Sequence, residues 1–161
     1  MPASAPVVDV DIASTADGIP SATAIRDWVK SALDVSRQPA AAAEVSVRIV
    51  EEAEMRTLNR DFRQQDKSTN VLSFPAGAIV GLPADADQLL GDIVVCAPVV
   101  AREAAEQGKQ LPHHWAHMVV HGVLHLLGYD HQSDEQAADM EALEKQALER
   151  HGIGNPYGAP R

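Results

Sequence analysis

The chain has 161 residues, of which 45% are hydrophobic and 22% charged, so its length and composition predict one folded domain and exclude a disordered or fibrous protein. Its formal net charge of −10 argues against broad binding to nucleic acid or anionic membranes, although a local basic site stays compatible with it. The single cysteine, Cys96, excludes an intrachain disulfide, and without a signal peptide or a long apolar run we expect a soluble cytoplasmic protein that does not enter a membrane.

Hydrophobic periodicity predicts two strands and two helices in alternation over the first half of the chain. Their expected ranges are 7–12 (strand), 21–33 (helix), 45–50 (strand) and 51–62 (helix). The strands show apolar and polar residues in alternation, and the helices show apolar residues at helical spacing. Ser21 is the expected N-cap of the first helix, because its hydroxyl can accept from free backbone N–H groups.

Two further strands and three helices are predicted in the second half. Their expected ranges are 69–74 and 92–96 (strands), then 99–108, 112–128 and 133–150 (helices). Residues 76–88 contain Gly and Pro and read as a long mobile loop, a type that is usually functional or disordered. Ser133 and Gln136 have the spacing of a capping box. We expect one domain over 1–161, with loose termini at 1–6 and 152–161.

This order of elements predicts the α+β class, with a mixed four-stranded sheet packed with about five helices. The strand–helix–strand unit at the front permits a parallel pair, and the two strands joined by the long loop can pair antiparallel. Periodicity alone does not fix the order of the strands in the sheet.

Histidine is concentrated in one segment, since six of the seven histidines lie between residues 113 and 131. His121 and His125 are four residues apart in an apolar helical segment, so both imidazoles lie on one face about one turn apart. Gly128 ends this helix and lets the chain turn back, so that His131 can complete a site of three nitrogens. The spacing is that of the metzincin zinc site, and we predict that these three histidines bind one metal ion at the end of the helix.

Three neutral imidazoles suit Zn²⁺ and leave a fourth position for water or substrate, as in catalytic zinc sites. Zinc lowers the pKa of its bound water to around 7, so a hydroxide nucleophile would be available at neutral pH. Nickel or another divalent transition metal would accept the same ligands, so the identity of the metal stays open. A regulatory or structural metal is the alternative. Asp130 is a candidate for orienting one of the imidazoles.

The residue beside the first histidine departs from the peptidase pattern. A HExxH peptidase carries a glutamate there as general base, whereas this chain has Gly122, which cannot accept a proton. Peptide hydrolysis by that route is therefore disfavoured, and a zinc hydrolase of peptides or small amides is kept as an alternative. We expect His117 to pack or to support the ligands, and His113 and His114 to be surface residues at the start of the helix.

Three motifs in order resemble the bacterial YbeY family of metal-dependent endoribonucleases, which are ribosomal RNA maturation factors. They are HGVLHLLGYDH at 121–131, FR followed by DKSTNVLSFP at 62–63 and 66–75, and LGDI at 90–93. The resemblance runs from about residue 45 to residue 148. It implies that His121, His125 and His131 hold the metal and that Arg63 is a functional arginine near the cleft.

The arginine of this resemblance lies in a local basic patch. Arg56, Arg60, Arg63 and Lys67 place four of the 13 basic residues within twelve positions, and such a patch can attract an RNA backbone to an otherwise acidic chain. Guanidinium matches the phosphate oxygens on which charge develops during cleavage. We predict that Arg63 is catalytic and that Arg60, Lys67 and Asn70 contact substrate. For Arg56 and Arg60, an exposed helix face paired with acids is the alternative.

The resemblance implies a metal-dependent endoribonuclease specific for single-stranded RNA. It implies a role in ribosomal RNA maturation, particularly at the 3′ end of 16S rRNA, and in ribosome quality control. Its partners would be single-stranded RNA, the small ribosomal subunit and assembly factors. The alternative to an enzyme is a ribosome-assembly factor in which the metal only joins the helix to the following loop.

Overall fold

The computed structural model describes residues 7–36, 44–75, 89–130 and 132–157. In these ranges the elements are β1 (Val7–Ile12), α1 (Ala22–Val35), β2 (Glu44–Val50), α2 (Glu52–Arg63), β3 (Val71–Pro75), β4 (Leu89–Cys96), α3 (Ala97–Gln107), α4 (Leu111–Leu126) and α5 (Asp134–Glu149). The predicted α+β class, with a mixed four-stranded sheet and five helices, is confirmed. The predicted loop over 76–88 lies outside the described residues.

The strands follow the order β1-β2-β4-β3 across the sheet. β1 and β2 are parallel and are joined by α1, β2 and β4 are also parallel, and β3 is antiparallel to β4. The parallel front pair and the antiparallel pair flanking residues 76–88 were both predicted. β3 is the strand at one edge of the sheet, and its side chains point alternately to the two faces.

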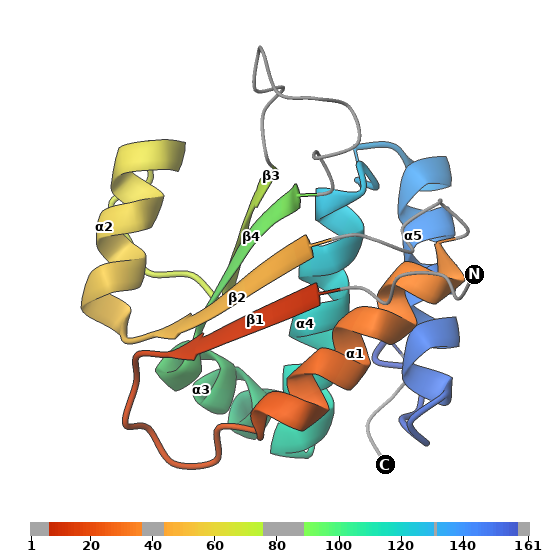
Figure 1. The fold of residues 1–161 in the computed structure, drawn as a ribbon, viewed down its shortest axis with the longest axis horizontal. Coiled ribbons are helices and arrows are strands. Elements are labelled where there is room, and N and C mark those ends of the chain that lie inside the picture. Colours follow the sequence, from red (N-terminus) through yellow and green to blue (C-terminus); the bar gives the residue numbers. More distant parts are fainter. Residues whose placement is uncertain (1–6, 37–43, 76–88, 131, 158–161) are drawn as a thin grey trace.

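Alternation along the strands divides the core between the two faces of the sheet. Val47, Ile93 and Val95 pack with α1, α4 and α5, whereas Val94 and Cys96 pack on the opposite face with α2. Figure 1 shows this arrangement, with α2 on one side of the sheet and α1, α4 and α5 on the other. α4 and α2 therefore cover different faces of the sheet, and each forms a hydrogen bond with Ser73 of the edge strand β3.

Helix α4 is the central helix of the larger core and is buried over most of its length. It approaches the sheet closely at Gly122, where an added Cβ would lie 2.9 Å from Ile93 Cγ2 and 3.3 Å from Val71 Cγ2. Glycine at this position allows the close contact, because any side chain would force the helix and sheet apart. This packing fixes which face of α4 is turned toward α5.

Two predicted helix caps are present in the structure. The Ser21 side chain accepts from the Ala24 N–H at the start of α1, and the Ser133 side chain accepts from the Gln136 N–H at the start of α5. Each bond is 3.1 Å long and satisfies one of the N–H groups that a helix start leaves without an intrahelical partner.

Residues 152–157, part of the segment expected to be a loose terminus, contact the helices. Ile153 is buried in the larger core, and the Tyr157 hydroxyl donates to a carboxylate oxygen of Glu144 in α5 at 2.6 Å. Within the described ranges, no helix combines the length and the hydropathy that crossing a membrane requires.

Candidate metal centre

One face of α4 carries His117, His121 and His125 at intervals of four residues. Their rings form a row along the helix, because four residues are slightly more than one turn. The ring centroids of His117 and His121 are 6.1 Å apart, and those of His121 and His125 are 4.5 Å apart. The row comes closest together at the C-terminal end of the helix, where the sequence predicts the metal.

The Nε2 atoms of His121 and His125 face each other at 3.0 Å. Two nitrogen ligands of a tetrahedral zinc ion, each about 2.0–2.1 Å from the metal, lie about 3.3 Å apart. The observed separation is close to that value, so this pair of nitrogens fits one divalent ion. His131, the third predicted ligand, lies outside the described residues, and the expected role of Asp130 stays a prediction.

A buried carboxylate lies on the other side of His121. Glu144 of α5 has no exposed surface, and its Oε2 is 2.9 Å from both His117 Nε2 and His121 Nδ1. Burial acts to raise the pKa of this carboxyl, but hydrogen bonds with His117, His121 and Tyr157 outweigh burial and bring the pKa to about 2. Glu144 is therefore a charged acceptor at neutral pH.

His117, His121 and Glu144 form a group able to hold a metal ion, since one ligand atom from each lies within 4.8 Å of the others. Glu144 is not among the site residues predicted from the sequence. The sequence does contain a signal for this residue. Glu144 falls on the apolar face of α5, four residues after Met140 and four before Leu148, and both of these are fully buried. A glutamate within an apolar stripe that packs near histidines is rarely buried without a partner.

Gly122 shows why the peptidase glutamate is absent. The position faces the sheet rather than the row of histidines, and its Cβ would already meet Ile93 and Val71. A glutamate there would have to enter the packed core. The geometry thus supports the argument from sequence that a general base of the HExxH type does not act here.

Arg63, at the C-terminus of α2, is connected through β3 to α4, the helix that carries the row of histidines. Its Nη2 donates to the Ser73 carbonyl at 2.9 Å, and the Ser73 hydroxyl donates to the Gly122 carbonyl at 2.9 Å. Gly122 follows His121 directly in the chain. The guanidinium therefore lies at the β3 edge, where α2 from one face of the sheet approaches α4 from the other.

The other predicted basic contacts lie on exposed surface around the end of α2. Arg60 is within 3.2 Å of its neighbour Asp61, and Lys67 is exposed in the turn that follows the helix. Arg56 forms a two-bond pair with Asp66, at 2.8 and 3.1 Å. Arg56 is exposed and paired with an acid, but Asp66 lies beyond the end of α2 rather than at the i+3 or i+4 spacing along the helix that the alternative expects.

Asn70 points toward α3 in this structure. Its side-chain amide donates to Glu103 at 3.1 and 3.2 Å, and its side-chain oxygen accepts from the Val71 N–H at 2.6 Å. His114 contacts the same Glu103, at 3.0 Å. The expectation that His114 is a surface residue is wrong, because only 3% of it is exposed. Its buried position follows from the packing of α3 on the first turns of α4.

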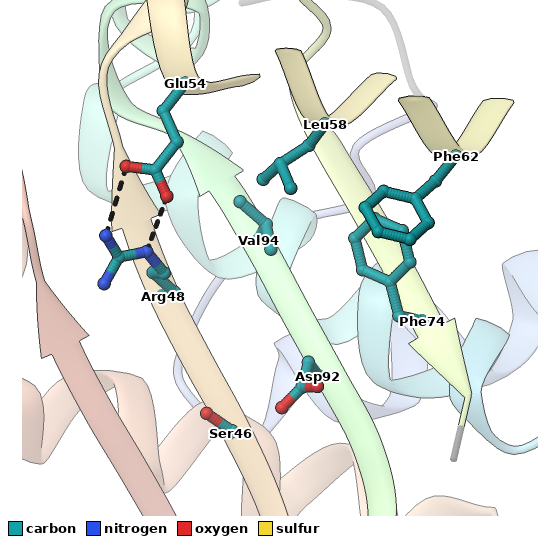
Figure 2. A pocket seen from close by; sticks show the side chains of 8 residues that line it. All are labelled: Ser46, Arg48, Glu54, Leu58, Phe62, Phe74, Asp92 and Val94. Carbon is teal, nitrogen blue, oxygen red and sulfur yellow. Dashed lines mark hydrogen bonds and ion pairs between the residues drawn. The ribbon is translucent and has the colours of Figure 1, made fainter. Parts of the chain in front are cut away.

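A separate pocket of about 540 Å³ lies between α2 and the face of the sheet that α2 covers, which is the face away from α4 (Figure 2). It is lined by Ser46, Arg48, Glu54, Leu58, Phe62, Phe74, Asp92 and Val94. Arg48 and Glu54 form an ion pair on one side, and Phe62 packs edge-to-face on Phe74 on the other, as Figure 2 shows. None of the predicted metal, catalytic or substrate residues lines this pocket.

Comparison with known proteins gives a consistent match. The family model described as endoribonuclease YbeY matches residues 11–152. A protein of that name from Halorhodospira halophila is 55% identical over 138 residues, which cover 86% of this chain and 88% of the relative. A second protein of that name, from Xanthomonas campestris, is 50% identical over 155 residues, which cover 96% of this chain and 94% of the relative.

A solved structure agrees in fold. The solution structure of a protein from Thermotoga maritima superposes with a TM-score of 0.56 at 24% sequence identity, and the alignment covers 92% of this chain and 99% of that protein. Residues 11–152, which the family model matches, contain the row of histidines, Glu144 and Arg63. The elements described above therefore belong to the shared fold.

Proposed function

The chain belongs to the YbeY family of endoribonucleases, and we propose that it is a metal-dependent endoribonuclease that cleaves single-stranded RNA during ribosomal RNA maturation. The proposal includes processing at the 3′ end of 16S rRNA and a part in ribosome quality control, in the cytoplasm, with the small ribosomal subunit and assembly factors as partners. The observation that carries it is the pair of histidine Nε2 atoms at 3.0 Å on α4, the helix that is linked to Arg63 through Ser73.

We assign the metal to His121, His125 and His131, with zinc as the expected ion. Imidazole nitrogens at close range suit zinc, nickel or another divalent transition metal better than a hard cation. When bound, such an ion supplies a Lewis acid that polarises a phosphoryl oxygen and lowers the pKa of a coordinated water.

Arg63 is the proposed catalytic residue. One N–H group of its guanidinium holds the Ser73 carbonyl, which fixes the side chain at the β3 edge. Other N–H groups of the same fork suit the non-bridging oxygens of a phosphodiester, on which negative charge grows during cleavage. Because the protein has pre-oriented this group, little reorganisation is needed when the charge develops.

Substrate contacts are proposed at the exposed end of α2. Arg60 and Lys67 lie within four residues of Arg63 in the sequence and both are exposed, so we propose that both contact the RNA backbone. The Asn70 amide is held by Glu103, and a contact from Asn70 to substrate would require it to leave that partner. Asn70 is therefore the weaker of the proposed contacts.

The experiment compares RNA and peptide cleavage by one purified, metal-loaded sample and by its His125→Ala variant. We expect the parent to cleave a defined RNA within its single-stranded segment, and the variant to lose both the metal and this activity. His151→Ala is the matched control, because His151 contacts Ser31 of α1 rather than the row of histidines. Peptide cleavage without RNA cleavage would overturn the proposal in favour of a peptide hydrolase.

The same variants separate the enzyme from an assembly factor in cells. If His125→Ala fails to support maturation of the small-subunit RNA while His151→Ala succeeds, the metal site is needed. Normal maturation with His125→Ala would instead support a role in which the metal is only structural.

A further inference from the structure

Glu144 is a fully buried carboxylate that the proposed reaction does not use. It belongs to α5 and has no exposed surface. Moving a charged carboxylate out of water is unfavourable unless hydrogen bonds replace those that water supplied. In this chain the replacement comes from two histidines of α4 and from a tyrosine of the C-terminal segment, and the arrangement of these partners is informative.

Each oxygen of Glu144 has its own partners. Oε2 lies 2.9 Å from both His117 Nε2 and His121 Nδ1, and Oε1 accepts from the Tyr157 hydroxyl at 2.6 Å. A carboxylate only accepts hydrogen bonds, so the proton of a neutral His121 lies on Nδ1 and the lone pair lies on Nε2. That Nε2 is the atom 3.0 Å from His125 Nε2.

We propose that Glu144 is a positioning residue for the metal site, which holds His121 with its proton on Nδ1 and its Nε2 lone pair directed at the metal. His117 and Tyr157 hold the carboxylate in place. The inference rests on the proposed function only for the identity of the metal ligands. Carboxylates that accept from the second nitrogen of a metal-binding histidine fix both its tautomer and its ring orientation.

The other interpretation is that Glu144 and His117 bind the metal themselves, together with His121. Two observations favour positioning. His117 Nδ1 is buried and has no partner among the described residues, so its proton belongs on Nε2, which then donates to Glu144 rather than to a metal.

The second observation is burial. The side chains of His117 and Glu144 are 7% and 0% exposed, against 17% for His121. An ion between His117 and Glu144 would be enclosed by protein and could not reach an RNA phosphate. His121 and His125 are half-buried, whereas His117 is buried, so the row is more exposed at its His121–His125 end, as a catalytic ion requires.

The test measures the affinity of the metal-free protein for Zn²⁺, by competition with a chromophoric chelator. We expect Glu144→Gln to bind Zn²⁺ about 10- to 100-fold more weakly than the parent, as for other changes behind a metal-binding histidine. The visible absorption of the Co²⁺ form should keep the shape of the parent spectrum, because the ligands themselves are unchanged. His151→Ala, which removes a contact to Ser31, is the control for packing between α1 and the end of α5.

Two milder variants keep the test decisive if Glu144→Gln does not fold. Tyr157→Phe removes only the hydroxyl that holds Oε1 and should weaken Zn²⁺ binding by a smaller factor. His117→Gln keeps a donor toward Glu144 and should retain the ion and the Co²⁺ spectrum. Thermal unfolding of the metal-free variants shows that each is folded.

Two results would overturn the inference. A folded Glu144→Gln or Tyr157→Phe variant with the parent's Zn²⁺ affinity would mean that Glu144 only joins α4 to α5. Loss of the ion in His117→Gln as complete as in His121→Ala, or an altered Co²⁺ spectrum, would mean that His117 is a ligand. Since the readout is metal binding without RNA, these failures are distinct from a failure to cleave RNA.

Discussion

Arg63 is held at the point where α2, β3 and α4 approach one another, with one donor on the Ser73 carbonyl. Its removal should lower kcat/KM for RNA by about 100- to 1,000-fold, the loss typical of a group that stabilises developing charge. Zn²⁺ affinity should be unchanged, because Arg63 belongs to α2 and none of the proposed ligands does. Steady-state cleavage of a defined RNA by Arg63→Ala measures the first effect, and chelator competition measures the second.

Arg56 supplies the matched control on the same helix. It is also an exposed arginine, but it is paired with Asp66, so Arg56→Ala removes an equal charge without removing the group linked to β3. If Arg63→Ala loses no more activity than Arg56→Ala, the removal of one positive charge explains the whole loss. The assignment of Arg63 as the catalytic residue then fails.

Helix α4 depends on a glycine for its distance from the sheet. Gly122→Ala would gain about 1 kcal/mol of helix propensity, but its Cβ would lie 2.9 Å from Ile93 Cγ2 in the core. Overpacking of a rigid core commonly costs about 1–3 kcal/mol, so we expect a net loss of stability of up to about 2 kcal/mol. Urea unfolding of the metal-free protein measures it, and an increase in stability would show that α4 can move away from the sheet at little cost.

Helix existence and the histidine pair were predictable because both depend on local spacing. Ser21 and Ser133 satisfy N–H groups a few residues away, and His121 and His125 share a face by helical geometry alone. Glu144 was missed because its partners belong to another helix and to the C-terminal segment. His114 was misplaced for a similar reason, since α3 covers it only in the folded chain.

Orientation at the ends of elements was less predictable than the elements themselves. Asn70 lies just before β3, and whether its side chain faces α3 or the cleft depends on Glu103, which is 33 positions away in the chain. The order of strands in the sheet likewise depends on pairing between distant segments. Local periodicity contains no information on either of these.

The molecule as a whole is acidic, with a net charge of −10, and its proposed RNA site is small. If Arg60, Arg63 and Lys67 are the groups that contact phosphates, the slope of log K against log salt for a single strand should be about −2. Fluorescence anisotropy of a labelled RNA, measured over a salt series with the metal removed to prevent cleavage, gives this slope. A much steeper slope would indicate a broad basic surface, which the proposed site does not provide.

Removal of the metal shows whether RNA cleavage by this protein depends on the ion. The purified protein is treated with a strong chelator, its zinc content is measured, and cleavage of a defined single-stranded RNA is followed before and after zinc is restored. We predict that activity disappears with the metal and returns with it in the parent protein, and that it does not return in His121→Ala. Full RNA cleavage by a preparation shown to be free of metal would contradict the account.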